Sequence, residues 1–107
     1  MCGIAVAIDW DGAEQIVPQL MNGILHRGDV SDRVVSPRPR TAMGTRRLRI
    51  VDMDRAVQPV ASFDGKLLVS FNGEIYNHHE LRLELEAQGV PFRTDADTEV
   101  LANALQV

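Results

Sequence analysis

The stretch that decides the fold is MCGIAVAI, residues 1–8, at the start of the chain. From Gly3 to Ile8 both alternating faces are apolar, a pattern typical of a strand buried on both sides. Cys2 is the only cysteine in 107 residues. A small, soft side chain at the head of a buried strand is one interpretation of it. The other is that loss of Met1 leaves a thiol and a free α-amino group on one residue.

The second interpretation gives the first residue a chemical use. A cysteine thiol has a reference pKa of about 8.5, so only a small fraction is thiolate at neutral pH. An α-amino group titrates at about 8, so a fair fraction is neutral and accepts a proton. Together the two groups form a nucleophile and its base, which is the logic of an N-terminal nucleophile. Cys2 alone leaves the structural and the catalytic interpretation open.

Composition and charge exclude several classes of protein. The length suits one domain with a real core. A net charge of −4 does not suit nucleic acid, which binds basic surfaces. One cysteine cannot form an internal disulfide, the chain start lacks the basic region of a signal peptide, and no stretch has the length of a membrane span. We expect a cytoplasmic protein that binds neither nucleic acid nor membrane.

The first half of the chain predicts a helix between strands. Apolar residues recur at helical spacing from 13 to 25, and Gly28 is a plausible stop. Pro18 lies within this pattern, so the helix is expected to begin late, near Val17, or to bend. Two further strands are predicted over residues 41–51 and 66–71, with a turn at FDG, residues 63–65.

Two helices are predicted in the second half. One begins at Asn77, with Glu80 in a capping-box arrangement, and ends at Gly89. Its apolar face is expected to comprise three leucines, Leu81, Leu83 and Leu85. The last helix is expected to have Asp97 as its N-cap and is still apolar where the sequence stops.

Three polar clusters could carry chemistry. In FNGEIYN, residues 71–77, the Asn72 side-chain amide and the Gly73 backbone N–H can converge on one oxygen, as an oxyanion hole requires. An ordinary Asn-Gly turn is the alternative interpretation. In GTRRLRIVD, residues 44–52, Arg47 and Arg49 share one strand face and Arg46 takes the other. An inward arginine offers a fork to a carboxylate, but we expect two of the three to lie on a solvated face.

The third cluster is TDADTEV, residues 94–100. Asp95, Asp97 and Glu99 lie at or near a helix start, where most acidic residues serve as caps. An inward carboxylate at this place could instead bind the ammonium group of a substrate.

Taken in order, five motifs resemble one family. They are MCGI (1–4), HRG (26–28), RLRIVD (47–52), NGEIYNHHELR (72–82) and DADTEV (95–100). They resemble the class II glutamine amidotransferase domain, specifically the glutaminase domain of asparagine synthetases. The resemblance implies an α+β fold, the αββα sandwich of N-terminal-nucleophile hydrolases. It covers about the first half of such a domain, so residues 1–107 are expected to be its N-terminal part, either truncated or completed by association as a homo-oligomer.

The resemblance also implies roles for individual residues. Cys2 attacks the side-chain amide of glutamine, and the Asn72 side chain and Gly73 backbone hold the oxyanion. Four residues are assigned to glutamine binding: Arg47 to the α-carboxylate, Asp97 and Glu74 to the α-ammonium group, and the backbone of Ile50 to the pocket wall. His26, Arg27 and Gly28 are given a supporting role near the nucleophile.

The sequence departs from the family pattern at two positions. Asp29 replaces the usual proline after Gly28, which is expected to loosen a loop near the site, and Arg49 replaces a usual serine.

The expected partners are glutamine and a synthetase domain or subunit that consumes ammonia, with aspartate as the default acceptor. No cofactor is expected in this segment, because ATP and magnesium belong to the synthetase domain. Two alternatives stay open: a non-catalytic remnant or interaction module of the same fold, and another N-terminal-nucleophile amidase. An amidase of this kind would account for the cysteine at position 2. It would not account for Arg47 and Asp97, the two residues that the resemblance assigns to glutamine binding.

Overall fold

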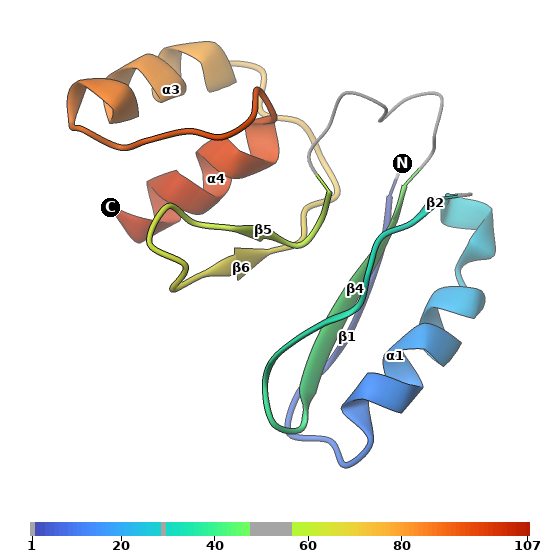
Figure 1. Ribbon diagram of the computed structural model, residues 1–107. Helices are drawn as coiled ribbons and strands as arrows, with labels where there is room; N and C mark the ends of the chain where they lie inside the picture. The colour runs from blue at the N-terminus through green and yellow to red at the C-terminus, as the bar shows by residue number, and fades with distance from the viewer. Residues whose placement is uncertain (1, 29, 48–56) are drawn as a thin grey trace.

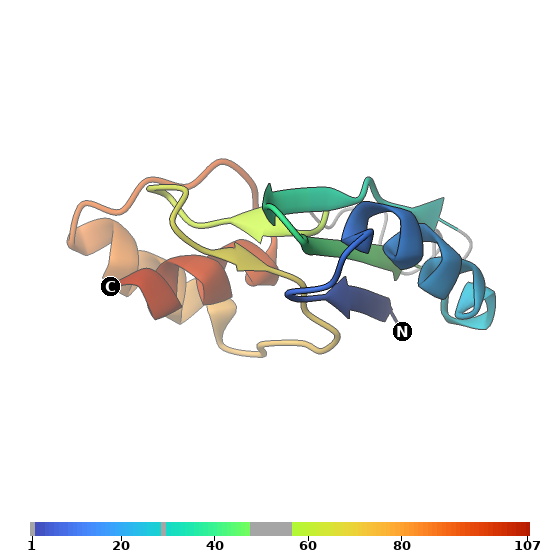
Figure 2. The same cartoon turned by 90° about the horizontal axis from the view of Figure 1, so that it is seen from below.

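The computed structural model describes residues 2–28, 30–47 and 57–107. Its elements, in chain order, are β1 (Gly3–Ala7), α1 (Ala13–Asn22), the 3-10 turn η1 (Leu25–Arg27), β2 (Val30–Ser31), β3 (Val35–Arg38), β4 (Thr41–Arg47), β5 (Val60–Ala61), β6 (Leu68–Val69), α3 (His78–Ala87) and α4 (Asp97–Gln106). The described chain is therefore α+β, as predicted. Two lobes lie side by side, one built on β1–β4 and α1 and the other on β5, β6, α3 and α4 (Figures 1 and 2).

The first lobe is an antiparallel sheet covered by α1. Strand β4 is central, with β1 on one side and both β2 and β3 on the other. Most sheet residues on the face toward α1 are glycine and alanine, so the helix approaches closely, and a Cβ on Gly44 would lie 2.4 Å from the sulfur of Met21. The buried cluster between helix and sheet consists of small and medium apolar residues, Ala5, Ala7, Ala13, Val17, Met21 and Ala42.

Strand β1 is buried on one face only, so the prediction of a strand buried on both faces is wrong. Ala5 and Ala7 point at α1 and are buried, whereas Ile4 and Val6 on the other face are 39% and 41% exposed. The second lobe lies beside the sheet in Figure 2, and in the described residues it does not cover this face. Apolar residues on both faces of a strand show that either face could be buried. Which face is buried depends on where another element packs against the strand.

Helix α1 begins at Ala13, so the prediction of a late start near Val17 is wrong. A proline inside a helix removes one backbone hydrogen bond and costs about 3 kcal/mol. Here Pro18 lies within the ten-residue helix. Ala13, Val17 and Met21 recur every four residues and are all buried against the sheet. Their burial outweighs the cost of the proline, and the helix keeps its first turn.

The same helix ends at Asn22, earlier than the predicted position 25. Leu25 instead begins the separate turn η1, which Gly28 follows. Gly28 crosses the end of β4 so closely that a Cβ on it would lie 2.4 Å from the backbone of Arg47. The glycine is therefore required by close backbone contact with the sheet rather than as the cap of a long helix.

We expect Gly28→Ala to destabilise the protein by about 1–3 kcal/mol, the usual cost of overpacking, because the added methyl group meets backbone atoms that cannot rotate away. Gly23→Ala is the matched control, since Gly23 has helical φ and ψ of −71° and −14°. It should change the free energy of unfolding by less than about 1 kcal/mol. Urea unfolding of both variants decides the matter, and equal midpoints would contradict the close contact.

The second lobe is built on a short hairpin and two helices. Strands β5 and β6 pair antiparallel, and the predicted strand over 66–71 is reduced to Leu68–Val69. Helix α4 packs against the hairpin and α3 packs against α4. A second buried cluster, Leu85, Val90 and Val100, joins the helices. Each lobe thus has an apolar core of its own.

The predicted face and cap of α3 are only partly observed. Leu85 is buried and Leu81 half-buried, but Leu83 is 68% exposed, so its assignment to the apolar face is wrong. Leu83 lies half a turn from Leu81 and Leu85, and α4 covers only one side of the helix. Asn77 is the N-cap, as predicted, but its side chain makes no capping hydrogen bond, so the capping box is not formed.

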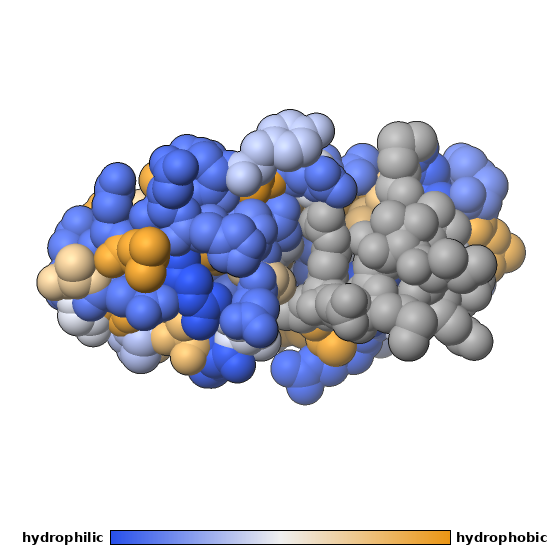
Figure 3. Space-filling model, turned by 90° about the horizontal axis from the view of Figure 1, so that it is seen from above, coloured by the Kyte–Doolittle hydropathy of each residue, from blue (hydrophilic) through white to orange (hydrophobic). Residues whose placement is uncertain are grey.

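The face of the molecule that carries α3 is mostly polar. Hydrophilic side chains dominate the face that carries α3, with hydrophobic side chains as separate spots (Figure 3). In the described ranges, none of the helices has the length and apolar character needed to cross a bilayer.

Candidate active site

Cys2 lies immediately before β1 and is buried. Its backbone N–H donates a hydrogen bond to Oδ1 of Asn72, at an N···O distance of 3.1 Å. Its carbonyl oxygen accepts a hydrogen bond from Nε of Arg27 at 3.2 Å. The backbone of Cys2 is therefore fixed on both sides, once by the HRG turn and once by a residue 70 positions away.

The sheet register brings Arg47 to the same end of the sheet. Gly3 pairs with Arg46 in the antiparallel ladder, so the next position outward places Cys2 level with Arg47. Alternation along the strands puts both residues on the face away from α1. The predicted nucleophile and the predicted carboxylate-binding residue therefore share one corner of the sheet.

The guanidinium of Arg47 forms a fork with Asp32. Its Nε lies 2.7 Å from Oδ2 and its Nη2 lies 2.8 Å from Oδ1. The two side chains are only 11% and 3% exposed, so this is a buried, bidentate ion pair. Asp32 was not among the predicted site residues. No local signal marks it, since it meets Arg47 only because β2 and β4 pair.

The expected solvated face of arginines is not observed. Arg46 is buried on the other face of β4, and its Nε donates to the carbonyl of Gly28 at 3.0 Å. Both described arginines of the motif are thus held by protein atoms, and Arg49 lies outside the described residues. The predicted separation of Arg46 and Arg47 onto opposite faces is confirmed.

Residues 70–75 belong to the loop between β6 and α3 and include the predicted oxyanion residues. In space this loop reaches from β4 to the start of α4. At one end, the hydroxyl oxygens of Ser70 and Thr45 lie 3.0 Å apart. At the other, the N–H of Ile75 donates to Oδ2 of Asp97 at 3.0 Å. A Cβ on Gly73 would lie 2.8 Å from the ring of Phe71, so this tight turn favours glycine. Asn72, Gly73 and Glu74 lie between the two anchors and are exposed.

The three acidic residues near α4 have different surroundings. Asp97 is buried as the first residue of the helix, and Ala96 is the N-cap, so the prediction of Asp97 as N-cap is wrong. Its carboxylate instead turns to the loop that carries Glu74. The Glu99 carboxylate accepts hydrogen bonds from the backbone of Arg93 and Thr94. Asp95 has a 99% exposed side chain.

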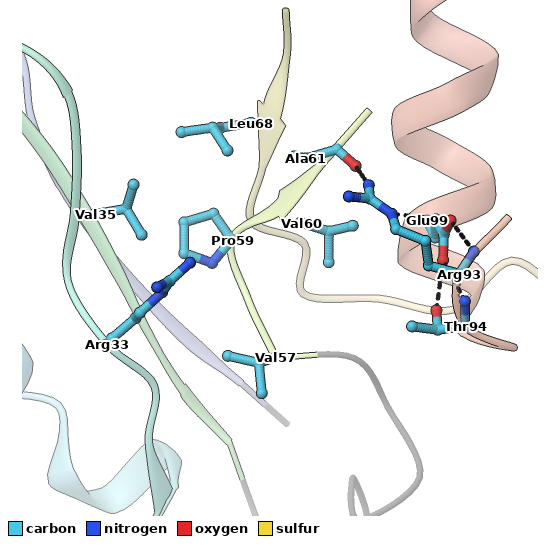
Figure 4. A pocket seen from close by; sticks show the side chains of 10 residues that line it. All are labelled: Arg33, Val35, Val57, Pro59, Val60, Ala61, Leu68, Arg93, Thr94 and Glu99. Atoms are coloured by element: carbon cyan, nitrogen blue, oxygen red, sulfur yellow. Dashed lines mark hydrogen bonds and ion pairs between the residues drawn. The ribbon is translucent and has the colours of Figure 1, made fainter. Parts of the chain in front are cut away.

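A cavity of about 330 Å³ lies between the lobes, away from this corner (Figure 4). Its lining includes apolar residues of β3, β5 and β6, the cationic side chains of Arg33 and Arg93, and the Glu99 carboxylate. Arg93 donates to the carbonyl of Ala61 at 2.7 Å. Among the predicted site residues that the structure describes, none lines this cavity. In the described residues, no group of three histidine, cysteine or acidic side chains is arranged to hold a metal ion.

The model of the glutamine amidotransferase domain family matches residues 1–107. The chain belongs to this family. Glutamine-hydrolyzing asparagine synthetase 1 of Bacillus subtilis (strain 168) is 46% identical over 88 residues, which are 82% of this chain and 14% of that protein. A probable glutamine-hydrolyzing asparagine synthetase of Schizosaccharomyces pombe is 39% identical over 106 residues, or 94% of this chain and 18% of that protein. The chain thus spans less than a fifth of the length of these relatives.

The glutamine amidotransferase resemblance predicted from the five motifs is confirmed. In this member of the family, the first strand, the end of β4 and the loop at 70–75 bring together Cys2, Arg47 and Asn72, and Asp97 lies behind the loop. Ile50 and position 29 lie outside the described residues. Arg27, expected to have a supporting role, contacts the carbonyl of Cys2 directly.

Proposed function

We propose that this glutamine amidotransferase domain hydrolyses glutamine to glutamate and ammonia, with Cys2 as an N-terminal nucleophile. The observation that carries the proposal is the hydrogen bond from the Cys2 nitrogen to Oδ1 of Asn72. It brings the group that would become the catalytic base next to the side chain assigned to the oxyanion. An α-amino group, formed by loss of Met1, is able to donate the same hydrogen bond.

The first half of the proposed reaction forms a thioester. The thiol proton passes to the α-amino group, and the sulfur attacks the amide carbon of glutamine, whose carbonyl oxygen becomes an oxyanion. Because Oδ1 of Asn72 accepts a bond from Cys2, its Nδ2 is the end left to donate to the oxyanion, together with the N–H of Gly73. The carbon–nitrogen bond then breaks, the α-ammonium group protonates the leaving nitrogen, and ammonia departs.

The second half releases glutamate. Water attacks the thioester while the α-amino group takes one of its protons, and the same two donors hold the second oxyanion. The carbon–sulfur bond breaks and the proton returns to the thiolate. No cofactor takes part in either half.

Glutamine would be held at its α-carbon by charged groups of opposite sign. We propose that Arg47 contacts the α-carboxylate, with its guanidinium oriented by Asp32, and that Asp97 and Glu74 receive the α-ammonium group. The backbone of Ile50 is proposed to line the pocket. The buried ion pair supports this part, because a guanidinium held by a carboxylate keeps one orientation without substrate.

The ammonia would pass to a synthetase domain or subunit. The names of the relatives favour aspartate as the acceptor, with ATP and magnesium bound by that synthetase part. We also propose that the complete domain is the αββα sandwich of N-terminal-nucleophile hydrolases, and that Cys2 works as a free thiol in the reducing cytoplasm. The exposed apolar face of β1 supports the sandwich, since a second sheet is what such a face accommodates.

Ammonia release from glutamine by the full natural chain tests the function. Intact mass measured before and after reaction with a glutamine-like electrophile would show whether Met1 is absent and whether one adduct forms. The expected result is ammonia release and a single adduct on Cys2. Glutamine binding without ammonia release or labelling would favour the non-catalytic module instead.

We expect Arg47→Lys to raise KM for glutamine by roughly 10- to 100-fold with little change in kcat. The loss is that of a charge-assisted hydrogen bond, which the ground state and the transition state share. Lysine is used because Arg47→Ala would leave Asp32 buried without its partner, at about 3–5 kcal/mol of stability. Arg40→Lys, a change at an exposed surface pair, is the control and should leave both constants unchanged. A fall in kcat at unchanged KM would contradict the assignment.

A further inference from the structure

We infer that Gln58 is the positioning residue that sets the oxyanion donors in register with the groups that bind glutamine. The inference rests on the proposed function and deepens it, since it names the residue that holds the two parts of that site together. Gln58 lies in the second lobe, two positions before β5, and is 0% exposed. A fully buried side-chain amide has to be hydrogen-bonded, so its partners show what it holds.

The carbonyl end of the side chain binds the backbone of residues 70–75, which we call the oxyanion loop. Its Oε1 accepts a hydrogen bond from the N–H of Phe71 at 2.8 Å. Phe71 directly precedes Asn72, so this bond fixes the backbone from which both proposed oxyanion donors extend. An oxyanion donor has to lie within a few tenths of an ångström of its place to be effective.

Two further polar groups of Gln58 contact residues beside the groups proposed to bind glutamine. Its backbone N–H donates to Oδ2 of Asp32 at 3.0 Å, and Asp32 holds the guanidinium of Arg47. Its Nε2 lies 3.4 Å from Oγ1 of Thr98, the residue next to Asp97. One residue therefore contacts the carboxylate that holds Arg47, the backbone of the loop at 70–75, and the residue that follows Asp97 in α4.

Only a side-chain amide meets this set of partners without a buried charge. Phe71 presents a donor, so it needs an acceptor, and Nε2 supplies a donor for the Thr98 hydroxyl oxygen. A glutamate would add a negative charge beside Asp32, and a methionine would fill the same space without either hydrogen bond. Gln58→Met therefore deletes both side-chain bonds while the backbone bond to Asp32 is kept.

Asn103 offers a matched control. It is also a fully buried side-chain amide in the second lobe that links two backbone segments, accepting from the N–H of Phe63 at 2.7 Å and lying 3.4 Å from the carbonyl of Pro91. It contacts neither the oxyanion loop nor Asp32 through these bonds. Asn103→Leu should thus reproduce the general cost of losing a buried amide, without the positioning effect.

The experiment compares the wild type, Gln58→Met and Asn103→Leu in the full natural chain, at a temperature where all three are folded by circular dichroism. Two readouts are taken: kcat and KM for ammonia release from glutamine, and hydrogen exchange of the amides of residues 71–75. For Gln58→Met we expect kcat to fall by roughly 10²-fold, the cost of a misplacement of about 1 Å, and exchange at 71–75 to accelerate. Asn103→Leu should leave both readouts at the wild-type values.

The outcomes separate this inference from the proposed function. If the wild type releases no ammonia, the proposed function is wrong, and the exchange readout alone decides whether Gln58 holds the loop. If the wild type is active and Gln58→Met keeps its kcat, or if exchange at 71–75 stays unchanged, the positioning role is wrong. Equal losses in Gln58→Met and Asn103→Leu would also overturn it, because the effect would then be one of stability.

Discussion

Cys2→Ala is expected to remove ammonia release from glutamine, by roughly 10⁶-fold or to the limit of the assay, while glutamine binding stays nearly unchanged. In the proposed mechanism the thiol forms the thioester, whereas glutamine is bound by other side chains, those of Arg47 and Asp97. Ammonia release measured with a coupled assay, together with calorimetric titration of glutamine, gives the two numbers. A variant that binds but does not turn over is the expected result.

The same experiment has a control in the chain start itself. If the α-amino group is the base, protein that retains Met1 should be as inactive as Cys2→Ala, because its cysteine nitrogen is then an amide. Intact mass measures the retained fraction, and activity should follow the fraction that has lost Met1. Full activity in a preparation that retains Met1 throughout would show that the proton is moved by some other group.

Asn72→Ala is expected to lower kcat by roughly 10²–10³-fold, the usual loss for one oxyanion donor. KM should change much less, since the donor acts on charge that develops only in the transition state. The structure adds a second contribution, because Oδ1 of Asn72 also accepts the bond from the Cys2 nitrogen. The steady-state constants of the purified variant test this expectation.

Asn77→Ala provides the comparison within the same loop. Asn77 lies five positions further on, is exposed, and makes no capping hydrogen bond with its side chain. Its replacement should leave kcat within about twofold of the wild type, as expected of surface substitutions. If Asn72→Ala changed only KM, or if both asparagine variants lost kcat equally, the oxyanion assignment would be wrong.

Local patterns in the sequence predict much of this fold. The helical spacing finds α1, and the turn at 63–65 and the helix after Asn77 are found by their turn and cap residues. What fails is decided by packing. Pro18 is tolerated because α1 lies on a sheet of small residues, and Leu83 is exposed because α4 covers only one side of α3. Neither neighbour is visible in the local sequence.

The candidate site divides in the same way. The motifs name Cys2, Arg47 and Asn72, and the structure places these residues at one corner. Asp32 and Gln58 escape notice because neither lies in a motif with a chemical meaning of its own. Each becomes part of the site only through a partner more than a dozen positions away, Arg47 for Asp32 and Phe71 for Gln58. Such supports become visible only when the chain is folded.

The contacts between the two lobes have a consequence for how glutamine binding would affect the stability of the whole molecule. The two buried clusters each draw their members from one lobe, whereas the contacts Cys2–Asn72, Thr45–Ser70 and Asp32–Gln58 between the lobes are polar. Polar contacts of this kind each add only about 0.5–1.5 kcal/mol. A ligand that is gripped by one lobe through its carboxylate and by the other through its ammonium group adds its own binding energy to their docking. Bound glutamine would then stabilise the association of the two lobes, and release of glutamate would remove this stabilisation.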